Sequence, residues 1–528
     1  MKSTTMIKAA ALVCASLAVG CGEARTEDGV LPTVGDAGAD GGDTGGISTS
    51  GADEDGDDED TGERYDVGGG EPPVGGCNGD SDCELIDVLF VIDNSGTMGE
   101  EQLNLAANFP LLVERLQNLE TGGVAVNADV NIMVTTTDFG HPLCTGFQRE
   151  GYAPAQGAPI FTGCNERIDG FSTPSNYNKI EIPDACTDSC PADVVPGGDP
   201  FIYFGSSGTN VPGGDVSGAL SCVGPQGIDG CGFEAPLETM LQSLRPEACW
   251  NDPSSDACKD HEDWGWVSKG FLRPGSTLAI AIITDEADCS VKSPDGFSYF
   301  TNTDNDEYWL EDPAADMPMP SSAICWNAGV KCTDDDEDGV YESCTSREDN
   351  PALHPVSRYT EFLEYLEGEN FNDIVMLGVL GVPPVTGHSE QAPYQPTEGG
   401  VAALEYRDWK DGEYDGTDAG GDILPGDWNK GVTAAEKQFE FGIGPGCTGK
   451  TTITIPGEDG GEDTEEEVFT GQAVPPVRIR EVCESLNTTD ASGNERIRCC
   501  IESICDDDFS PAIDCLTGII AETFTPVG

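Results

Sequence analysis

Basic residues are scarce in this chain of 528 residues, which has 25 Lys and Arg against 97 Asp and Glu and a net charge of −72. A polyanion of this size repels nucleic-acid phosphates and anionic lipid surfaces, so the composition excludes both as electrostatic partners. It attracts cations instead, and calcium is the first candidate. Histidine is scarcer still, with four widely spaced residues, which argues against His-rich zinc sites and most His-based catalysis.

The N-terminal apolar stretch is short. It covers 9–20, follows Lys2 and Lys8, and has too few residues to span a bilayer. These features predict a secretory signal over 1–20. The stretch ends in Leu-Ala-Val-Gly-Cys, which resembles a bacterial lipobox. This resemblance implies that Cys21 is lipidated and becomes the mature N-terminus; an ordinary signal peptide with a chance cysteine is the alternative.

Aromatic residues are nearly absent from 22–76, which holds 16 acidic residues, 16 glycines and two arginines. Such a segment cannot bury enough apolar surface to offset its ordering entropy, and its charge keeps it extended. We therefore expect 21–76 to be a lipidated cysteine followed by a disordered acidic Gly/Asp-rich linker. The linker would hold a folded domain away from a membrane that the chain contacts through its lipid alone. The expected location is the outer membrane or cell surface of a Gram-negative bacterium.

Cysteine, in contrast, is plentiful. Of 22 cysteines, Cys14 lies in the predicted signal and Cys21 is the predicted lipidation site, which leaves twenty in the exported part. An even number in an exported chain predicts a disulfide framework, with a connectivity that cannot be deduced from the sequence. No Cys or His pattern with zinc spacing accompanies the close pairs 186/190 and 499/500.

Four near-continuous apolar runs predict strands that are buried on both faces of a parallel sheet. These strands are 86–92, 129–135, 278–284 and 374–380. Apolar residues at helical spacing predict helices over about 100–119, 235–244 and 356–366, and Ser510-Pro511 begins a final helix. Strands that alternate with helices indicate an α/β fold with a doubly wound, mostly parallel sheet.

Three long segments rich in Gly, Pro, Asp and Cys interrupt this pattern, at about 139–230, 286–352 and 383–476. We interpret them as insertions in one domain that covers 77–528. Segments of this length without regular structure are uncommon unless they are cross-linked or functional. Cysteines within the first two insertions can supply such cross-links.

Two strand ends carry candidate metal ligands. The first strand ends in Asp-Asn-Ser-Gly-Thr, which contains Asp93, Ser95 and Thr97, and the third ends in a Thr-Asp pair that contains Asp285. These motifs resemble the Asp-x-Ser-x-Ser/Thr loop and the later Thr-Asp pair of the von Willebrand factor A (vWA) family. The resemblance implies a vWA/Rossmann-like doubly wound sheet with a metal ion at the carboxyl ends of its strands.

Oxygen ligands of this kind suit a hard divalent ion. Ser95 and Thr97 can turn both hydroxyls to one point, while Asp93 and Asp285 can bind the ion directly or through water. Few full carboxylate charges then contact the ion, so it stays electrophilic and accepts an acidic group from outside. The resemblance therefore implies Mg²⁺ or Mn²⁺, and a protein partner that presents a carboxylate.

The vWA family also supplies a threonine from a middle loop before a helix. The matching segment here, 230–238, contains no threonine. Either Glu234 substitutes, or residues 135–137 fold across, or the site is incomplete. The alternative for the first loop is a tight strand-to-helix turn that uses Asn, Ser and Gly for backbone reasons.

Three segments together resemble a subgroup of vWA lipoproteins from myxobacteria and related bacteria. They are 282–290, 230–238 and 503–511. This likeness covers most of 84–382 and the final helix, and it matches the insertion at 383–476 poorly. It bears on architecture more than on function.

An acidic run in the second insertion fits Asp-x-Asp-x-Asp-Gly, the opening half of a calcium loop. Its candidate ligands are Asp334, Asp336, Asp338 and Glu342. The twelfth position holds Thr345 rather than the bidentate glutamate of an EF-hand. Cysteines bracket the loop and could clamp it, so Ca²⁺ binding and a solvated acidic turn are both open interpretations.

Residues 444–451 match the phosphate-binding pattern Gly-x4-Gly-Lys-Thr. Residues 452–456 after it have the composition of a strand, whereas a phosphate loop needs a helix whose N-terminus faces the phosphates. We therefore do not expect nucleotide binding.

The favoured function is that of a non-enzymatic, envelope-anchored vWA module that captures a protein partner through a divalent ion. A calcium-dependent structural or matrix protein of the cell surface is the alternative. A secreted hydrolase with its site in the Cys-rich insertions is disfavoured, because the sequence has no Gly-x-Ser-x-Gly or His-Glu-x-x-His motif.

Overall fold

The computed structural model describes residues 83–524 with several gaps. The gaps are 146–147, 173–181, 188–189, 191–198, 256–257, 259–269, 335–337, 370–372, 413–420, 425–426, 428–429, 456–463, 490–492 and 494. The predicted signal over 1–20, the lipidation site Cys21 and the linker to residue 76 therefore lie outside the described residues.

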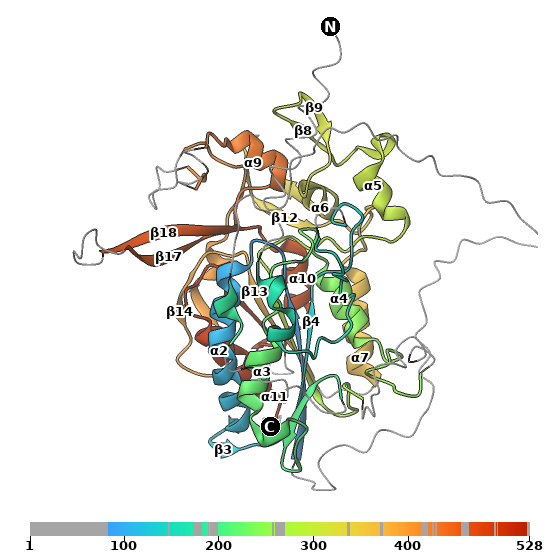
Figure 1. Cartoon of the computed structure of the whole chain (residues 1–528), viewed down its shortest axis with the longest axis vertical. Coiled ribbons are helices and arrows are strands. Elements are labelled where there is room, and N and C mark those ends of the chain that lie inside the picture. Colours follow the sequence, from blue (N-terminus) through green and yellow to red (C-terminus); the bar gives the residue numbers. More distant parts are fainter. Residues whose placement is uncertain are drawn as a thin grey trace, which may run out of the picture. The chain divides into compact units, whose positions relative to one another are not determined.

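A seven-stranded, mostly parallel sheet forms the centre of this part of the chain (Figure 1). Its strands in spatial order are β21 (Cys499–Ser503), β13 (Asp373–Leu380), β7 (Thr277–Ile283), β1 (Cys83–Ile92), β4 (Asn127–Thr136), β5 (Ile202–Gly205) and β6 (Gly208–Thr209). The first five run parallel, and the last two pair antiparallel at one side. Because the parallel strands point the same way, the loops that follow them gather at one edge.

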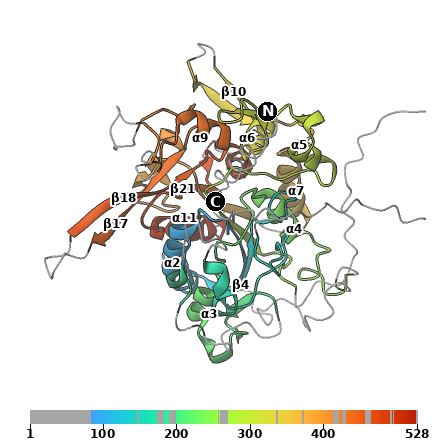
Figure 2. The same ribbon diagram turned by 45° about the horizontal axis from the view of Figure 1, so that its top comes forward.

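Helices cover both faces of the sheet (Figures 1 and 2). The first face is covered by α2 (Gly99–Gln117), α3 (Val216–Val223) and α11 (Ser510–Thr523), and the second by α4 (Pro236–Leu244), α7 (Ser357–Glu369) and α10 (Val477–Ser485). Successive strand residues point to opposite faces. Phe90 of β1 thus packs edge-on against Phe109 of α2, with ring centroids 5.8 Å apart, while Leu89 and Val91 are buried on the opposite face. This burial on both faces explains the continuous apolar runs.

The α/β class and the mostly parallel sheet are confirmed. The four predicted strands correspond to β1, β4, β7 and β13, and the predicted helices correspond to α2, α4, α7 and α11, with bounds that differ by a few residues. The fifth parallel strand, β21, was not predicted. It has only five residues, and two cysteines and Glu502 leave it without a continuous apolar run. The segment 139–230 is not wholly an insertion, since β5, β6 and α3 within it belong to the sheet and its cover.

The second and third insertions contain short elements, several of which lie beyond the carboxyl edge of the sheet (Figure 1). These elements are α5 (Ser298–Thr301), β8 (Leu310–Asp312), β9 (Met317–Met319), α6 (Ala323–Gly329), β10 (Val330–Thr333), β11 (Val340–Tyr341), β12 (Ser343–Ser346), β14 (Val385–His388), β15 (Pro396–Gly399), β16 (Tyr406–Arg407), α9 (Ala434–Phe441), β17 (Cys447–Ile455) and β18 (Thr464–Ala473). Elsewhere, β2 (Glu120–Thr121) pairs with β3 (Val124–Ala125) and β19 (Thr488–Thr489) with β20 (Glu495–Arg496). The phosphate-loop pattern runs into β17, so the predicted strand is present there instead of a helix.

Disulfides cross-link the described residues extensively, as predicted. They join Cys144–Cys231, Cys164–Cys186, Cys190–Cys222, Cys249–Cys258, Cys289–Cys325, Cys332–Cys344, Cys447–Cys505, Cys483–Cys499 and Cys500–Cys515. Cys83 is also disulfide-bonded, and none of the described cysteines is free. This many disulfides is typical of an oxidising, exported environment. Among the described helices, none has the length and apolar character needed to cross a membrane.

Candidate metal centre

Three loops meet at the carboxyl edge of the sheet, and together they contain all five predicted ligands. The loop after β1 is tied to β7, because the Asp93 amide donates to the Ile283 carbonyl at 2.9 Å. The loop after β4 is tied to β1 and to the segment before α4, through hydrogen bonds from the Thr137 amide to Ile92 and from the Ala235 amide to Thr137. The backbone of neighbouring strands thereby positions the loops that carry Asp93, Asp285 and Glu234.

Asp93 follows β1 directly, and its side chain has no solvent exposure. Its Oδ1 accepts a hydrogen bond from the Ser95 amide at 2.7 Å, and its Oδ2 accepts one from the Thr284 hydroxyl. Burial raises the pKa of Asp93 to about 6, and these hydrogen bonds oppose the shift. The first bond forms a tight turn at the strand end, as the backbone interpretation of the loop expects. A turn and a metal site are thus compatible here.

The hydroxyls of Ser95 and Thr97 lie side by side, with their oxygens 3.2 Å apart. Ser95 is buried, whereas Thr97 is exposed. Thr97 also lies within reach of the Asp285 side chain and lowers its pKa. The two hydroxyls therefore lie together beside Asp285, and their convergence on an ion stays a prediction.

Asp285 follows β7 and is almost completely buried. Its Oδ1 atom has no hydrogen-bond partner within the described part of the chain. Burial, and then the charge of Asp93, raise the pKa of Asp285 to about 8. Its backbone carbonyl accepts a hydrogen bond of 2.7 Å from Val474, which joins the third insertion to this strand end.

Glu234 lies before α4 and is completely buried. Neither carboxylate oxygen has a hydrogen-bond partner among the described residues. Burial raises the pKa of Glu234 well above its usual range, and the charges of Asp93 and Asp138 raise it further, while the neighbouring Thr137 hydroxyl lowers it. The sequence left three alternatives for the missing threonine: Glu234, residues 135–137, or an incomplete site. Glu234 and Thr137 both lie next to Asp93 at the strand ends. The Thr135 hydroxyl instead donates to the Ala158 carbonyl at 2.8 Å.

Sequence reasoning missed two further acidic residues here. Asp138 follows β4 and accepts hydrogen bonds from the Tyr152 hydroxyl at 2.7 Å and the Gly140 amide at 2.8 Å. Glu286 follows Asp285, and burial together with the Asp285 charge raises its pKa well above its usual range. Asp138 could have been found from the sequence, because it lies only three residues after the end of the predicted strand 129–135, near the edge where Asp93 and Asp285 were expected.

Helix α9 contributes a lysine whose charge acts on Glu286. Lys437 lies 3.3 Å from Glu440 and 3.7 Å from Asp427, measured from Nζ to carboxylate oxygen. Its charge also lowers the pKa of Glu286. The charges that act on Asp93, Asp285 and Glu234 come from other acids, and no basic side chain is among them.

The donor atoms at this edge are all oxygens, which suits a hard divalent ion. Among the described residues, no three Asp, Glu, His or Cys side chains converge at metal-ligand distance. The predicted set relies on two hydroxyls as well as on carboxylates, and buried carboxylate oxygens without partners lie beside them. The residues present therefore fit a divalent ion through mixed hydroxyl and carboxylate ligation, and metal binding stays a prediction.

The candidate calcium loop lies between β10 and β11, and none of its residues belongs to the candidate metal centre. Asp336 is outside the described residues. The Asp334 carboxylate accepts hydrogen bonds from the amides of Asp338 and Gly339, and Asp338 accepts one from Val340. The backbone amide of the exposed Glu342 donates a hydrogen bond to the Thr333 carbonyl. These carboxylates hold the loop's own backbone, as expected for an acidic turn, and Ca²⁺ binding stays a prediction.

The comparisons with known proteins add no family assignment. No protein-family model matches this chain, and no curated protein aligns with it significantly. The functional argument therefore rests on the residues and their geometry.

Proposed function

We propose that this chain is an envelope-anchored vWA-like module that captures a protein partner through a divalent ion at the carboxyl edge of its sheet. The observation that carries the proposal is a set of buried carboxylates without a cation. Asp285 and Glu234 bury oxygens that have no partner in the described chain. An isolated buried carboxylate is costly, and a bound cation removes that cost.

Asp93, Ser95, Thr97 and Asp285 would hold a Mg²⁺ or Mn²⁺ ion, with Glu234 in place of the missing threonine. When bound, the ion supplies a positive charge that attracts a carboxylate of the partner. The residues themselves set the geometry: Asp93 is fixed by its hydrogen bonds from Ser95 and Thr284. Thr97 is exposed beside the buried Ser95, so the site opens at that side. Helices on both faces of the sheet, and the position of this site, support the vWA resemblance.

The same proposal places the module outside the cytoplasm. The disulfides support export, and the signal over 1–20 with Cys21 supports a lipid anchor on the outer membrane or cell surface of a Gram-negative bacterium. The acidic linker would then give the module reach from the membrane. Mass spectrometry of the native N-terminus tests the anchor, and an unlipidated terminus at another position contradicts it.

The ion site is tested with Asp285→Asn, a substitution of the same shape that removes the charge. Its Oδ1 atom has no hydrogen bond to lose, so the fold should persist. Calorimetric titration with Mg²⁺ and Mn²⁺ should show one specific site in the parent and none in the variant. The control is Asp304→Asn, because Asp304 is exposed and lies in a single 3-10 turn, Thr303–Asn305, of the second insertion. Equal uptake by parent and Asp285→Asn protein would assign the binding to diffuse acidic charge instead.

Partner capture is tested with the full chain immobilised and exposed to cell-envelope extract. Proteins retained by the parent should elute with EDTA and should not be retained by the Asp285→Asn protein. Retention that is unchanged by both EDTA and the substitution would remove the ion from the mechanism.

A further inference from the structure

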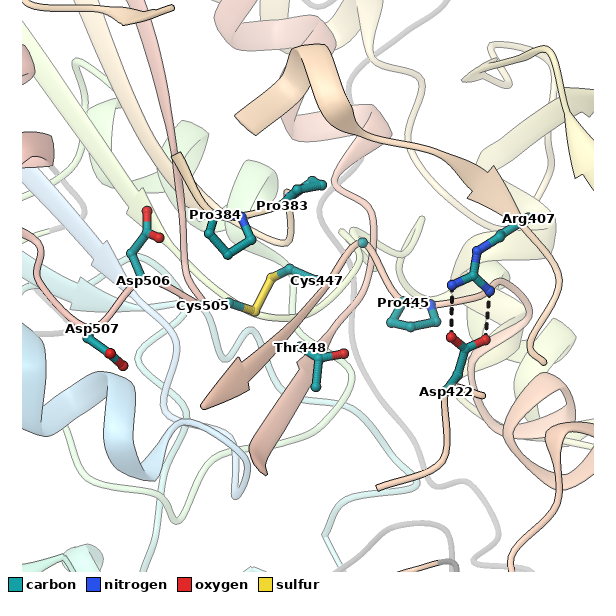
Figure 3. Close-up of a pocket in the computed structure, with 11 residues that line it drawn as sticks. Pro383, Pro384, Arg407, Asp422, Pro445, Cys447, Thr448, Cys505, Asp506 and Asp507 are labelled. Atoms are coloured by element: carbon teal, nitrogen blue, oxygen red, sulfur yellow. Dashed lines mark hydrogen bonds and ion pairs between the residues drawn. A yellow bond between two sulfur atoms is a disulfide. The ribbon is translucent and has the colours of Figure 1, made fainter. Parts of the chain in front are cut away.

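A pocket of about 510 Å³ opens at the same edge of the sheet, beyond the ends of β13 and β21. Its volume is within the range of roughly 300–1,000 Å³ that is typical of small-ligand sites. It is lined by Pro383, Pro384, Arg407, Asp422, Pro445, Gly446, Cys447, Thr448, Cys505, Asp506 and Asp507 (Figure 3). None of these residues belongs to the candidate metal centre, so the pocket is a separate site.

The middle of the pocket is apolar and rigid. Pro383, Pro384 and Pro445 lie around the disulfide between Cys447 and Cys505 (Figure 3). The disulfide joins the start of β17 to the loop after β21, and proline fixes its own backbone. This wall can pack against methylene groups without changing its shape, so little ordering entropy opposes binding.

The two ends of the pocket carry different charges. Asp506 and Asp507 lie at one end, and Arg407 with Asp422 lies at the other (Figure 3). Arg407 binds Asp422 through two hydrogen bonds of 2.6 and 2.8 Å, and so neutralises it. The acidic end keeps a net charge of two carboxylates.

The two carboxylates at the acidic end have few partners. Asp506 accepts a hydrogen bond of 3.3 Å from the Val385 amide, which holds its side chain in place. Asp507 is exposed and makes no hydrogen bond or ion pair with the described residues. One fixed and one unpaired carboxylate therefore face any ligand that enters from this end.

We propose that this pocket binds an ammonium or guanidinium group on an apolar stem, such as an arginine or lysine side chain. The cation would lie against Asp506 and Asp507, and the stem would pack on the prolines and the disulfide, which is how such side chains bury their methylene groups. An anionic ligand is disfavoured, because the guanidinium of Arg407 is already bound to Asp422 and to the Asp408 carbonyl.

Binding should weaken in acid. Burial raises the pKa of Asp506 to about 6, while His388 lowers it and the neighbouring Asp507 and Asp508 raise it. Below this pH, Asp506 is protonated and no longer attracts a cation. The charged groups near it are His388 from β14, the two aspartates of its own loop, and Glu502 of β21, which hydrogen-bonds His388 and whose pKa the charge of Asp506 raises.

The test uses agmatine and the peptide N-acetyl-Ala-Arg-Ala-amide, with the citrulline peptide as the neutral isostere. Titrations of the full chain in EDTA should show saturable binding of the cationic probes and none of the citrulline peptide. Asp506→Asn and Asp507→Asn should each weaken it about tenfold, the loss expected for one charge-assisted contact. Binding of agmatine alone identifies a small-molecule amine as the source, and preference for the peptide identifies a protein side chain.

The matched control is again Asp304→Asn, which removes one exposed charge away from the pocket and should leave the affinity unchanged. Equal binding of the citrulline and arginine peptides, equal weakening by all three substitutions, or no saturation would overturn the proposal. Because the titration is done in EDTA, its result is independent of the proposed ion. Loss of ion binding in the Asp285→Asn protein should leave this pocket intact.

Discussion

At the amino-terminal edge of the sheet, Asp87 and Asp129 share the guanidinium of Arg273, each at 2.7 Å. The arrangement is completed by the Ser276 hydroxyl, which donates to Asp87 at 2.6 Å. At the carboxyl-terminal edge, the acids Asp93, Asp285 and Glu234 are also buried, and the charges that shift their pKa values most are those of other acids. The described part of the sheet therefore pairs its buried acids with arginine at one edge, whereas at the other edge burial and neighbouring acids raise their pKa values.

The pairing at the amino-terminal edge extends to its neighbouring strands. Asp373 begins β13 and pairs with both Arg496 and Arg498. Burying a charge without a partner costs several kcal/mol, so removing the arginine from a buried pair here should destabilise the fold. The chain has 25 basic residues in all, and several of them are used at this edge. The difference is that the first edge pairs its buried acids with arginines of the chain, whereas the acids of the second edge are the ones that the proposed ion would neutralise.

The largest expected effect on stability comes from removing Arg273, which pairs with the buried acids at the amino-terminal edge of the sheet. Arg273→Met should lower the free energy of unfolding by about 3–5 kcal/mol, because it leaves Asp87 and Asp129 buried without a cation. Chemical denaturation measures this. The control is Arg115→Met, since the pair of Arg115 with Asp514 is about half exposed and should contribute about 1 kcal/mol or less. Equal losses in the two variants would show that the buried network has no special role.

The second effect is stabilisation by the proposed ion at the carboxyl-terminal edge of the sheet. A divalent ion that binds the folded state alone should stabilise the parent by about 2.7 kcal/mol at a hundredfold excess over its Kd. Asp285→Asn should remove this gain, and Arg273→Met should keep it. Thermal unfolding with Mg²⁺ or EDTA separates the two. A gain that survives in the Asp285→Asn protein would place the ion elsewhere.

A third substitution should matter only when the ion is present. In EDTA, burial and the charges of Asp93 and Asp138 raise the pKa of Glu234 well above its usual range, so its carboxyl is protonated and Glu234→Gln exchanges one neutral group for another. The stability should therefore change little. With Mg²⁺ present, the same change removes a proposed ligand and should weaken the affinity for the ion about tenfold, which lowers its stabilising effect by about 1.4 kcal/mol. Paired melting curves in EDTA and in Mg²⁺ measure both arms. The same change in stability with and without the ion would exclude Glu234 from the site.

The smallest expected effect is a change in pH dependence. Burial raises the pKa of Glu502 to about 7 from its usual 4.5, although its hydrogen bonds with His388 oppose the shift. The folded protein holds this proton to higher pH than the unfolded chain does. The resulting stabilisation is full below pH 4.5 and is lost as the pH rises through 7. Glu502→Gln should reduce the slope of stability against pH in this window by about 1 kcal/mol per pH unit, and an unchanged slope would contradict the assignment.

Much of the sheet and part of the site followed from local patterns. The runs that became β1, β4, β7 and β13 are apolar on both faces, and a parallel sheet covered by helices requires that pattern. Aspartates directly after such runs were correctly expected at one edge. β21 escaped because two cysteines and Glu502 interrupt its apolar character, and β5 because it lies in a segment without clear periodicity.

The amino-acid sequence by itself determined the α/β class, the order of the central elements, the disulfide-rich character and the position of Asp93 and Asp285 at strand ends. It did so because period, burial and turn chemistry act over a few residues. Only the tertiary structure decided which charges are neutralised. Arg273 reaches Asp87 across 186 residues of sequence, whereas the charges that raise the pKa of Glu234 are those of Asp93, Asp138 and Glu286. Charge pairing depends on distance in space, so it was settled when the chain folded.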